Sequence, residues 1–352
     1  MLTSLTGQLR QGQTLSAAQI DTAIGEIVDE RASAEVKADF LIALAQKGET
    51  IEEIAAFARG LRDHSLAPPL DAATRSRGIL DVVGTGGDRL NTFNISTTVA
   101  LVAAAAGVTV AKHGNRAVTS KSGSADVLEA LGIKTDLTPE QVAQWLREHR
   151  FAFLFAPRFH PAFKHIGPAR KLCAERGQRT IFNFLGPLLN PARPSAQLIG
   201  VPRPQLCEPI ARVLQSMGVA RGMVVSGQAA PQVWLDELSV LGETTIAEFY
   251  QERGFSCSVL HPGQFPLQPA ALADLVGGDA AANANTVRRL LRGEDRGPKR
   301  DTVLLNAAAA LLVAGITRTL SDGWEMAATV IDSGQAAAKL NDLIQASQDP
   351  SA

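Results

Sequence analysis

The sequence has few aromatic residues and almost no net charge. Aromatic residues make up 5% of the 352 residues, and Tyr250 is the only tyrosine, which leaves little for stacking nucleic-acid bases. The formal net charge is −1, whereas a protein that binds nucleic acid through bulk electrostatics is strongly basic. We therefore expect no nucleic-acid partner.

Cysteines and long apolar runs are also scarce. Cys173, Cys207 and Cys257 are odd in number, far apart and without C-x-x-C spacing, which predicts buried thiols in a reducing compartment and excludes a disulfide framework or a zinc site. The apolar runs at 99–110 and 307–316 are too short to span a bilayer. Residues 1–14 lack the pattern of a signal peptide. We expect a cytoplasmic protein with no membrane partner.

Helical periodicity dominates the first part of the chain. Apolar residues recur at helical spacing through residues 16–64 in three successive stripes. Ser16 and Thr50 are expected N-caps, Thr50 with Glu53 as a capping box, and Gly48 is expected to end the middle helix. Pro68-Pro69 then interrupts the pattern. We predict a small all-helical domain over residues 1–70.

After Gly78 the pattern alternates between strands and helices. Short apolar runs at 79–83, 108–111, 151–155, 198–201 and 223–225 have strand length, and segments 125–131, 139–149 and 205–217 have helical patterns. This alternation predicts an α/β domain over residues 71–352, with a mostly parallel sheet flanked by helices. Segment 159–191 shows broken helical pieces and no strand, and we expect residues 160–190 to complete the helical domain or line a cleft. Segments 302–315 and 321–344 are alanine-rich and helical.

A glycine-rich turn follows the first predicted strand. Asp81-Val-Val-Gly-Thr-Gly-Gly-Asp88 precedes Thr92-Phe-Asn-Ile-Ser-Thr97, so backbone N–H groups of the turn and of a helix N-terminus can approach an anion closely. The spacing differs from G-x-G-x-x-G, because Arg89 stands where the third glycine would be, and it is no Walker A loop. The alternative is a tight strand–helix turn without a ligand.

A second polar loop is expected after the second strand. Lys112-His-Gly-Asn-Arg116 places three basic side chains together, and Ser120, Ser122 and Ser124 lead into the next helix. Both loops should lie at the carboxyl edge of the sheet, where open α/β folds bind ligands. This arrangement suits a polyphosphorylated, magnesium-bound small molecule.

Carboxylates near these loops have two interpretations each. Asp88 would repel a phosphate unless it holds a metal-bound water or a sugar hydroxyl; otherwise it is a turn or N-cap residue. Asp236-Glu237 supplies hard oxygen ligands that suit magnesium, but an Asp-Glu pair is commonly a solvated surface.

A further cationic group is expected on one helix through residues 160–170. His160, Lys164 and Arg170 lie there, and Arg170 can pair as a bidentate fork with a carboxylate on a substrate. The alternative is an ordinary exposed helix charge.

Taken together, these motifs resemble those of the anthranilate phosphoribosyltransferase family over nearly the whole length. They include Gly84-Thr-Gly-Gly-Asp88, Asn94-Ile-Ser-Thr97, Lys112-His-Gly-Asn-Arg116, Ser122-Gly-Ser-Ala-Asp126, His160-Pro161, Arg179-Thr-Ile-Phe-Asn183, Leu185-Gly-Pro187, Asn190-Pro191 and Leu235-Asp-Glu-Leu-Ser239. The span from Arg170 to Arg179 is a few residues longer than the family pattern, and the stretch 229–234 is expanded.

The resemblance implies a helical domain joined to an α/β domain, an active site at the hinge and a homodimer formed through the helical domains. It implies transfer of the phosphoribosyl group of phosphoribosyl pyrophosphate to the amino group of anthranilate. The residues implied to hold phosphoribosyl pyrophosphate are Gly84, Gly87, Asp88, Thr92, Asn94, Ile95, Ser96, Thr97, Lys112, His113, Gly114, Asn115, Arg116, Ala117, Val118, Thr119, Ser120 and Ser124.

The same resemblance assigns Mg2+ to Ser96, Asp236 and Glu237. It assigns anthranilate to Asn115 and Arg170, and it makes Lys112, Asn115 and Arg170 the expected catalytic residues. Two alternatives stay open. A pyrimidine nucleoside phosphorylase shares this architecture, although its Lys-x-Ser substrate loop is missing, and a non-catalytic relative binds nucleic acid.

Overall fold

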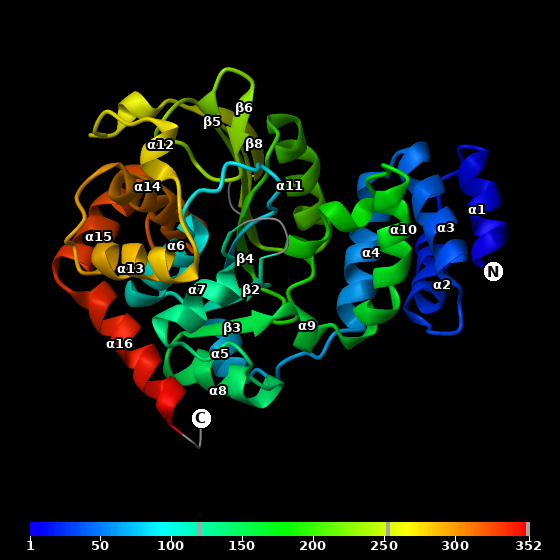
Figure 1. Ribbon diagram of the computed structural model, residues 1–352, viewed down its shortest axis with the longest axis horizontal. Coiled ribbons are helices and arrows are strands. Elements are labelled where there is room, and N and C mark those ends of the chain that lie inside the picture. Colours follow the sequence, from blue (N-terminus) through cyan, green and yellow to red (C-terminus); the bar gives the residue numbers. More distant parts are fainter. Residues whose placement is uncertain (118–120, 251–253, 350–352) are drawn as a thin grey trace.

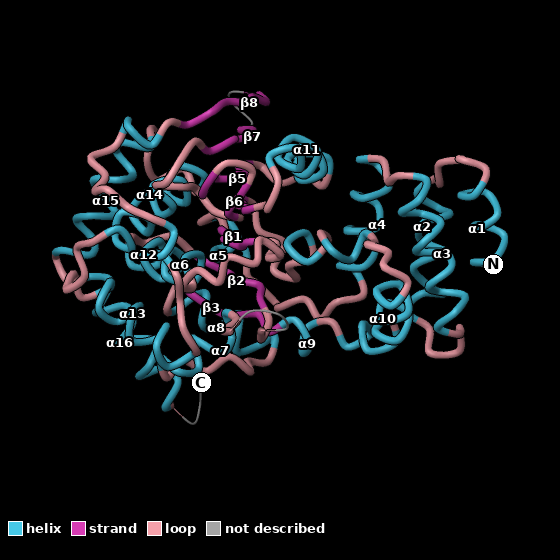
Figure 2. Tube along the Cα trace, turned by 45° about the horizontal axis from the view of Figure 1, so that its top comes forward, coloured by secondary structure: helices cyan, strands magenta, loops and turns pink. Residues whose placement is uncertain are grey.

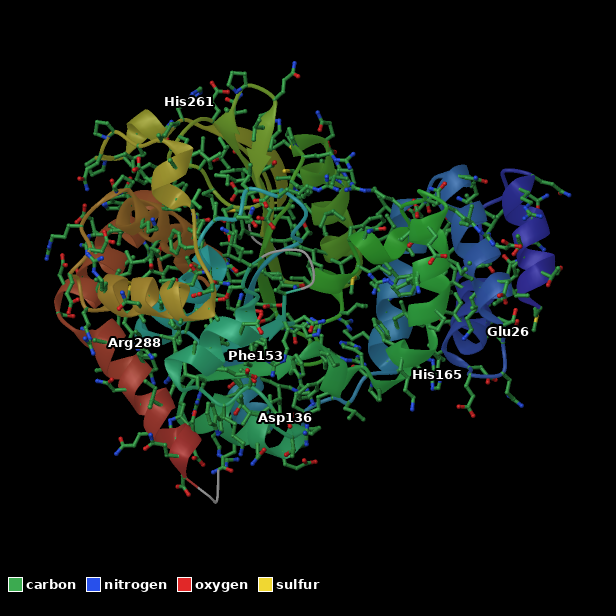
Figure 3. The ribbon with its side chains drawn as sticks, viewed as in Figure 1. Glu26, Asp136, Phe153, His165, His261 and Arg288 are labelled. Carbon is green, nitrogen blue, oxygen red and sulfur yellow. The ribbon has the colours of Figure 1, made fainter. Side chains whose placement is uncertain are left out.

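The computed structural model describes residues 1–117, 121–250 and 254–349 of the chain. It has a small lobe of helices that contains the N-terminus and a larger lobe built on a sheet (Figure 1). Figure 3 marks Glu26 and His165 in the small lobe and Phe153 and Arg288 in the large one. Both lobes and their fold class match the architecture that the sequence predicts.

The small lobe contains the three predicted helices and one that the periodicity did not predict. Its first four helices are α1 (Leu2–Arg10), α2 (Ala17–Val28), α3 (Ala34–Lys47) and α4 (Ile51–Asp63). The expected caps are confirmed: Ser16 and Thr50 accept hydrogen bonds in capping boxes, and Gly48 ends α3 with a φ of 87°. Helix α10 (Gly167–Glu175) packs against α3, so part of segment 160–190 joins this lobe.

The large lobe contains one eight-stranded sheet in the order β3-β2-β1-β4-β5-β7-β8, with β6 paired to β5. The strands are β1 (Leu80–Gly84), β2 (Val110–Gly114), β3 (Phe151–Phe155), β4 (Ala196–Gly200), β5 (Arg221–Ala230), β6 (Val233–Leu235), β7 (Thr244–Tyr250) and β8 (Gly254–Leu260). Strands β1 to β5 run parallel, as predicted. Strands β6, β7 and β8 are antiparallel additions that the sequence did not reveal.

Helices cover both faces of this sheet (Figure 2). Neighbouring residues of a strand face opposite sides, so Leu198 of β4 packs in an apolar cluster with α6 and α14, whereas Ile199 packs with α11 and the small lobe. The α-helices of the large lobe are α5 (Ala72–Ser76), α6 (Ile95–Ala105), α7 (Ser124–Leu131), α8 (Pro139–Glu148), α9 (Ala156–Phe159), α11 (Cys207–Ser216), α12 (Leu272–Leu275), α13 (Ala280–Leu291), α14 (Pro298–Val313), α15 (Leu320–Asp332) and α16 (Gln335–Gln348).

Segment 159–191 consists of broken helical pieces and has no strand, as predicted. The 3-10 turns in this segment are Pro161–His165, Ile181–Asn183 and Gly186–Leu188, and two more lie at Pro204–Leu206 and Pro262–Gln264. The expectation that His160, Lys164 and Arg170 share one helix is therefore wrong. Pro161 begins one helical piece and Pro168 follows Gly167 in the first turn of the next, because proline cannot donate to the preceding turn.

One further expectation needs correction. Cys173 and Cys207 are buried as expected, but Cys257 is exposed, because it lies on β8, an antiparallel strand at the edge of the sheet. The segment 321–344 is helical as predicted, and it contains two helices, α15 and α16, separated by Ser333 and by Gly334, which has a φ of 81°. Among the described helices, none is long and apolar enough to cross a membrane.

Candidate active site

Strands β1 and β2 are neighbours, and both polar loops leave the sheet at its carboxyl edge. The loop after β1 runs to α6, whose N-cap is Asn94, and the loop after β2 runs to α7, which begins at Ser124. The predicted placement of the two loops is therefore confirmed. It follows from the parallel pairing, since both strands end at the same edge.

A cavity of about 580 Å³, which we call the carboxylate cavity, lies between these loops. It is lined by most residues that the sequence singled out, namely Gly84, Gly87, Asp88, Thr92, Asn94, Ile95, Ser96, Thr97, Lys112, His113, Gly114, Asn115, Ser124, Asp236 and Glu237. Arg89 and Asn91, which the sequence reasoning did not assign to the site, also line it. Their backbone φ values of 61° and 52° are uncommon for residues other than glycine.

Asp236 and Glu237 follow directly after β6, and they lie at the cavity rather than on a solvated surface. Asp236 Oδ2 accepts a hydrogen bond from the Gly86 backbone N–H at 2.7 Å. Glu237 is 8% exposed. The surface interpretation of this pair is therefore wrong, and the pair reaches one site because it leaves a strand end.

Burial raises the pKa of both carboxyl groups above their usual range. The pKa of Asp236 is raised first by desolvation and then by the nearby charge of Asp88. The pKa of Glu237 is raised by desolvation and by Asp236, while Lys112 opposes the shift. Two carboxylates that repel each other in a cavity are the donor set that a divalent cation stabilises, and Mg2+ commonly uses one or two carboxylates together with substrate phosphates.

Lys112 is the cation nearest to these groups, and it is buried in β2. Its Nζ donates to the Val82 carbonyl oxygen at 2.7 Å and to Ser96 Oγ at 3.2 Å. The residue is 1% exposed, and desolvation lowers its pKa. The expectation of a cationic loop is therefore wrong for Lys112 and His113, which belong to a strand that extends to Gly114.

Arg116 does belong to the loop, but its guanidinium faces carboxylates of α7. It contacts Glu129 at 2.6 Å and 2.7 Å and Asp126 at 3.4 Å. The backbone N–H of Ala117 donates to Asp126 Oδ2 at 2.9 Å. Neither residue lines the carboxylate cavity. Val118, Thr119 and Ser120, also assigned to phosphoribosyl pyrophosphate by resemblance, lie outside the described residues.

Two glycines at the strand ends are required by close packing. A Cβ atom at Gly84 would overlap the carboxylate of Asp236, and a Cβ atom at Gly114 would overlap Ser124 Oγ and the ring of Phe153. The Gly86 N–H, which the sequence suggested for an anionic ligand, is used by Asp236. The glycines thus leave room at the strand ends, and the Gly86 N–H holds the Asp236 carboxylate at the cavity.

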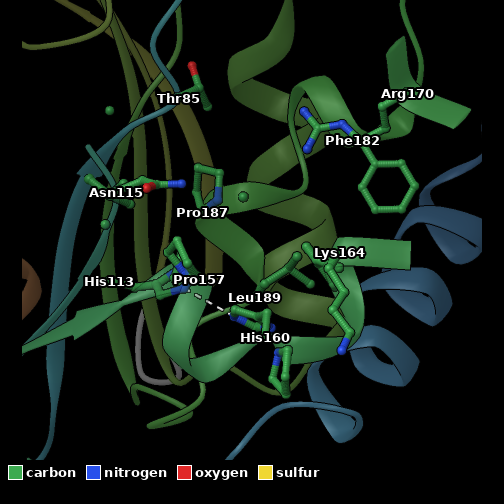
Figure 4. Close-up of a pocket in the computed structure, with 17 residues that line it drawn as sticks. Thr85, His113, Asn115, Pro157, His160, Lys164, Arg170, Phe182, Pro187 and Leu189 are labelled. Carbon is green, nitrogen blue, oxygen red and sulfur yellow. Dashed lines mark hydrogen bonds between the residues drawn. The ribbon is translucent and has the colours of Figure 1, made fainter. Parts of the chain in front are cut away.

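A second cavity, of about 660 Å³, shares a wall with the first and is called the histidine cavity here (Figure 4). Both cavities are lined by Val83, Gly84, His113, Gly114 and Asn115. The second is otherwise lined mainly by apolar groups, among them Pro157, Phe163, Phe182, Pro187 and Leu189, which sequence reasoning did not assign. Its polar side chains include Lys164 and Arg170.

Arg170 and Asn115 lie on opposite sides of the histidine cavity (Figure 4). The Arg170 guanidinium lies over the Phe182 ring at 5.5 Å from its centroid. Desolvation lowers the pKa of Arg170, although the side chain is exposed along part of its length. A guanidinium held at an apolar wall without a carboxylate partner among the described residues suits a planar anionic ligand.

His113 and His160 form a buried pair between the cavity and the sheet. Their Nε2 atoms are 3.1 Å apart. Desolvation lowers the pKa of His113 to about 3, with His160 contributing, and lowers the pKa of His160 to about 4. Both imidazoles are therefore neutral at pH 7, and one nitrogen donates to the other.

A buried network under the shared wall was not foreseen as functional. Asp81 Oδ2 accepts from Asn190 Nδ2 at 2.9 Å, and Asp81 Oδ1 accepts from the His113 N–H at 3.3 Å. Asn190 Nδ2 also donates to the Ala111 carbonyl oxygen at 2.7 Å. The network joins β1 and β2 to the segment that carries Pro187 and Leu189. The one available signal was the Asn190-Pro191 motif.

Asp88 makes a local contact that favours neither interpretation alone. Its Oδ1 accepts from the Leu90 N–H at 3.1 Å, which is an Asx turn. The same carboxylate raises the pKa of Asp236, so it also belongs to the group of acidic side chains at the cavity. Among the described residues, no three His, Cys, Asp or Glu side chains form a metal site by themselves.

The fold and the two adjoining cavities are typical of an enzyme that transfers a glycosyl group. The model of the glycosyl transferase family α/β domain matches residues 76–337, and that of the family's helical bundle domain matches residues 3–65. More narrowly, the chain belongs to the anthranilate phosphoribosyltransferase family. The family that the motifs suggested is thereby confirmed.

Three relatives illustrate this membership. The anthranilate phosphoribosyltransferase of Geobacter sulfurreducens is 47% identical over 343 residues, covering 94% of this chain and 95% of that protein. The crystal structure of the Thermus thermophilus enzyme has a TM-score of 0.88 at 40% identity, covering 98% and 99% of the two chains. The Saccharomyces cerevisiae enzyme in complex with PRPP and Mg has a TM-score of 0.86 at 28% identity, covering 98% and 97%.

Proposed function

We propose that this protein transfers the phosphoribosyl group of phosphoribosyl pyrophosphate to the amino nitrogen of anthranilate and releases pyrophosphate, a step of tryptophan biosynthesis. The observation that carries the proposal is the shared wall of the two cavities. A diphosphate site and an aromatic-acid site that meet at Gly84 and Asn115 bring a sugar carbon and an amine together. The relatives favour this reaction over nucleoside phosphorolysis or nucleic-acid binding.

Phosphoribosyl pyrophosphate would bind in the carboxylate cavity. The N-terminus of α6 and the amide of Gly87 would face its phosphates, and the sequence-assigned residues that line this cavity would make the site. Arg116 would have to leave Glu129 before it could contact the ligand. Lys112 donates to Val82 and Ser96, so we assign it the role of a positive charge held in place beside the acidic pair.

Asp236, Glu237 and Ser96 would hold magnesium beside the diphosphate. The donor set fits, because Glu237 is buried, Asp236 is half-buried and the two carboxylates repel each other, and the yeast relative was crystallised with PRPP and Mg. The ion, when bound, would stabilise negative charge on the leaving pyrophosphate. The protein's part is to keep Asp236 in place through the Gly86 N–H.

Anthranilate would bind in the histidine cavity, with its carboxylate on Arg170 and its amine beside Asn115. A structure of the yeast relative contains 4-fluoroanthranilate. An aryl amine is already neutral at pH 7, so the reaction needs placement rather than a strong base. Because His113 and His160 are both neutral at pH 7, they would present no charge to the amine.

We also propose how the enzyme is assembled. The active site lies where the helical domain, residues 1–70, meets the α/β domain, residues 71–352. Two copies associate through their helical domains as a homodimer, and the enzyme works in the cytoplasm. Domain closure would exclude water that competes with the amine.

The reaction can be tested directly through the fluorescence of anthranilate. Purified protein with Mg2+, phosphoribosyl pyrophosphate and anthranilate should consume that fluorescence, and omission of either the sugar phosphate or the metal ion should prevent it. Folded protein that leaves anthranilate unchanged under these conditions would contradict the proposal.

A further inference from the structure

A third cavity lies on the other side of the glycine loop, between the two lobes. It has a volume of about 550 Å³, and we call it the arginine cavity. The α/β lobe contributes Gly86, Gly87 and Arg203, and the small lobe contributes Glu49 after α3. Gly86, Gly87 and Arg89 line the carboxylate cavity as well. One loop thus separates the two cavities.

The walls of this cavity carry unpaired positive charge. Arg89, Arg179 and Arg203 are exposed, and their guanidinium groups contact no carboxylate among the described residues. The neighbouring Arg176, in contrast, pairs with Asp39 at 2.8 Å. Glu49 supplies the one carboxylate in the lining, and burial raises its pKa. The cavity therefore has an excess of positive charge, contributed from both lobes.

The backbone at Arg89 adds an independent observation. Its φ of 61° lies in the left-handed region, which is strained for residues other than glycine, asparagine and aspartate. Strained positions persist where the surrounding structure or the function requires them. A glycine would adopt this conformation without strain, so the chain keeps an arginine at the boundary of the two cavities at a conformational cost.

Arg179 supplies another of the three charges from the small-lobe side. Helix α10 ends at Glu175, and Gly177, with a φ of 68°, turns the chain so that Gln178 and Arg179 line the cavity. The ion pair of Arg176 with Asp39 fixes this turn against α3. The turn after α10 therefore places a cation from the small lobe at the cavity between the lobes.

We propose that the arginine cavity is a second diphosphate-binding site, which receives pyrophosphate as it leaves the carboxylate cavity. Arginine forks match phosphate oxygens in a bidentate manner. Because the cations come from both lobes, they repel each other across the cavity, and a diphosphate between them neutralises that repulsion. That the ligand is the reaction's own product rests on the proposed function, whereas the diphosphate chemistry of the cavity does not.

Calorimetric titration of the full-length protein with inorganic pyrophosphate and Mg2+ tests the site. The unchanged protein should bind two equivalents, and the double variant Arg179→Gln/Arg203→Gln should bind one. Arg318→Gln, which alters an exposed arginine far from the cavity, should still bind two. One equivalent for the unchanged protein, or two for the double variant, would overturn the proposal. Arg89 is left intact because it also lines the carboxylate cavity.

A parallel titration with phosphoribosyl pyrophosphate distinguishes the source of the diphosphate. One equivalent assigns the second site to free pyrophosphate, whereas two equivalents, reduced to one in the double variant, assign it to the substrate's diphosphate as well. Either result supports a diphosphate site, whereas pyrophosphate binding that the two substitutions leave unaffected contradicts it.

Kinetics separate this inference from the proposed function. In the double variant, kcat and both KM values should stay unchanged, while inhibition by added pyrophosphate should weaken about tenfold, the expected cost of losing charge-assisted hydrogen bonds. Loss of turnover in the double variant would place these arginines in the substrate site and overturn the inference. Absence of turnover in the unchanged protein, with two equivalents of pyrophosphate still bound, would contradict the proposed reaction but would still support the second diphosphate site.

Discussion

The carboxylate cavity and the histidine cavity share one wall but are built on different physical principles. In the carboxylate cavity, charged side chains are buried and held by backbone groups, as Lys112 is by Val82 and Asp236 is by Gly86. In the histidine cavity, rings and prolines form the surface, and Arg170 provides a charge at its edge. The comparison teaches that a charged ligand group needs preset dipoles, whereas an aromatic ligand needs mainly shape.

The difference has an energetic consequence. Buried carboxyl groups with raised pKa values destabilise the folded protein at neutral pH, because desolvation and mutual repulsion disfavour their ionised forms. The apolar surface of the histidine cavity carries no such penalty. Function and stability should therefore conflict in the first cavity and not in the second.

The largest effect is expected for Asp236→Asn. The substitution keeps an acceptor for the Gly86 N–H but removes the charge that repels Glu237 and Asp88. We expect kcat to fall by on the order of 100-fold, as when one preorganised charge-stabilising group is lost, while the melting temperature rises. Steady-state kinetics at saturating Mg2+ and thermal unfolding measure the two quantities.

The control for Asp236→Asn is Glu30→Gln, which removes an exposed carboxylate away from the cavities. It should change neither activity nor melting temperature. If Asp236→Asn lowers the melting temperature, the repulsion at this site is not what limits stability, and the contrast between the cavities fails.

A smaller and more selective effect is expected for Arg170→Ala. Removing the guanidinium over Phe182 should raise the KM for anthranilate about tenfold, which corresponds to one charge-assisted contact, and leave the KM for phosphoribosyl pyrophosphate nearly unchanged. Lys171→Ala, one residue further along α10 and exposed, is the matched control. Equal changes in both KM values would place the carboxylate partner elsewhere.

The remaining prediction concerns stability rather than catalysis, namely its pH dependence at the shared wall. The pKa of His160, about 4 in the folded state, lies below the unfolded value of about 6.5, so the unfolded state binds the extra proton between these values. The free energy of unfolding should therefore fall as the pH decreases through this range. In His160→Gln this fall should be shallower, by up to about 1.4 kcal/mol per pH unit.

Urea unfolding at about pH 7 and about pH 5 measures this difference. His64→Gln, at an exposed histidine, should leave the slope as it is in the unchanged protein. An identical slope in His160→Gln and the unchanged protein would show that the pair is not held neutral by burial.

Much of the fold followed from the periodicity of apolar residues and from the positions of glycine, proline and capping residues in the sequence. The helices of residues 16–64 and the caps at Ser16, Gly48 and Thr50 were predictable, because capping chemistry is local. The parallel strands and their glycine turns were predictable for the same reason. Strands β6 to β8 were not, because β6 (Val233–Leu235) is very short and the pairing of β7 with β5 is decided by contacts outside each strand's own sequence.

The site was partly predictable, and the errors have a common cause. Lys112 and His113 looked like loop residues because their side chains are polar, yet both belong to β2 and are buried. Arg116 looked free for an anion, but Glu129 of α7 pairs with it. In each case a partner from another element decides the role of the charge, and a single sequence does not reveal that partner.

By itself, the sequence determined which groups could carry chemistry and at which strand ends they would stand, because glycine turns, caps and apolar runs act over a few residues. Only the tertiary structure decided which of those charges are buried, paired or facing a cavity. Desolvation and Coulomb interactions depend on neighbours in space, and Asp236 meets Gly86 across a separation of 150 residues.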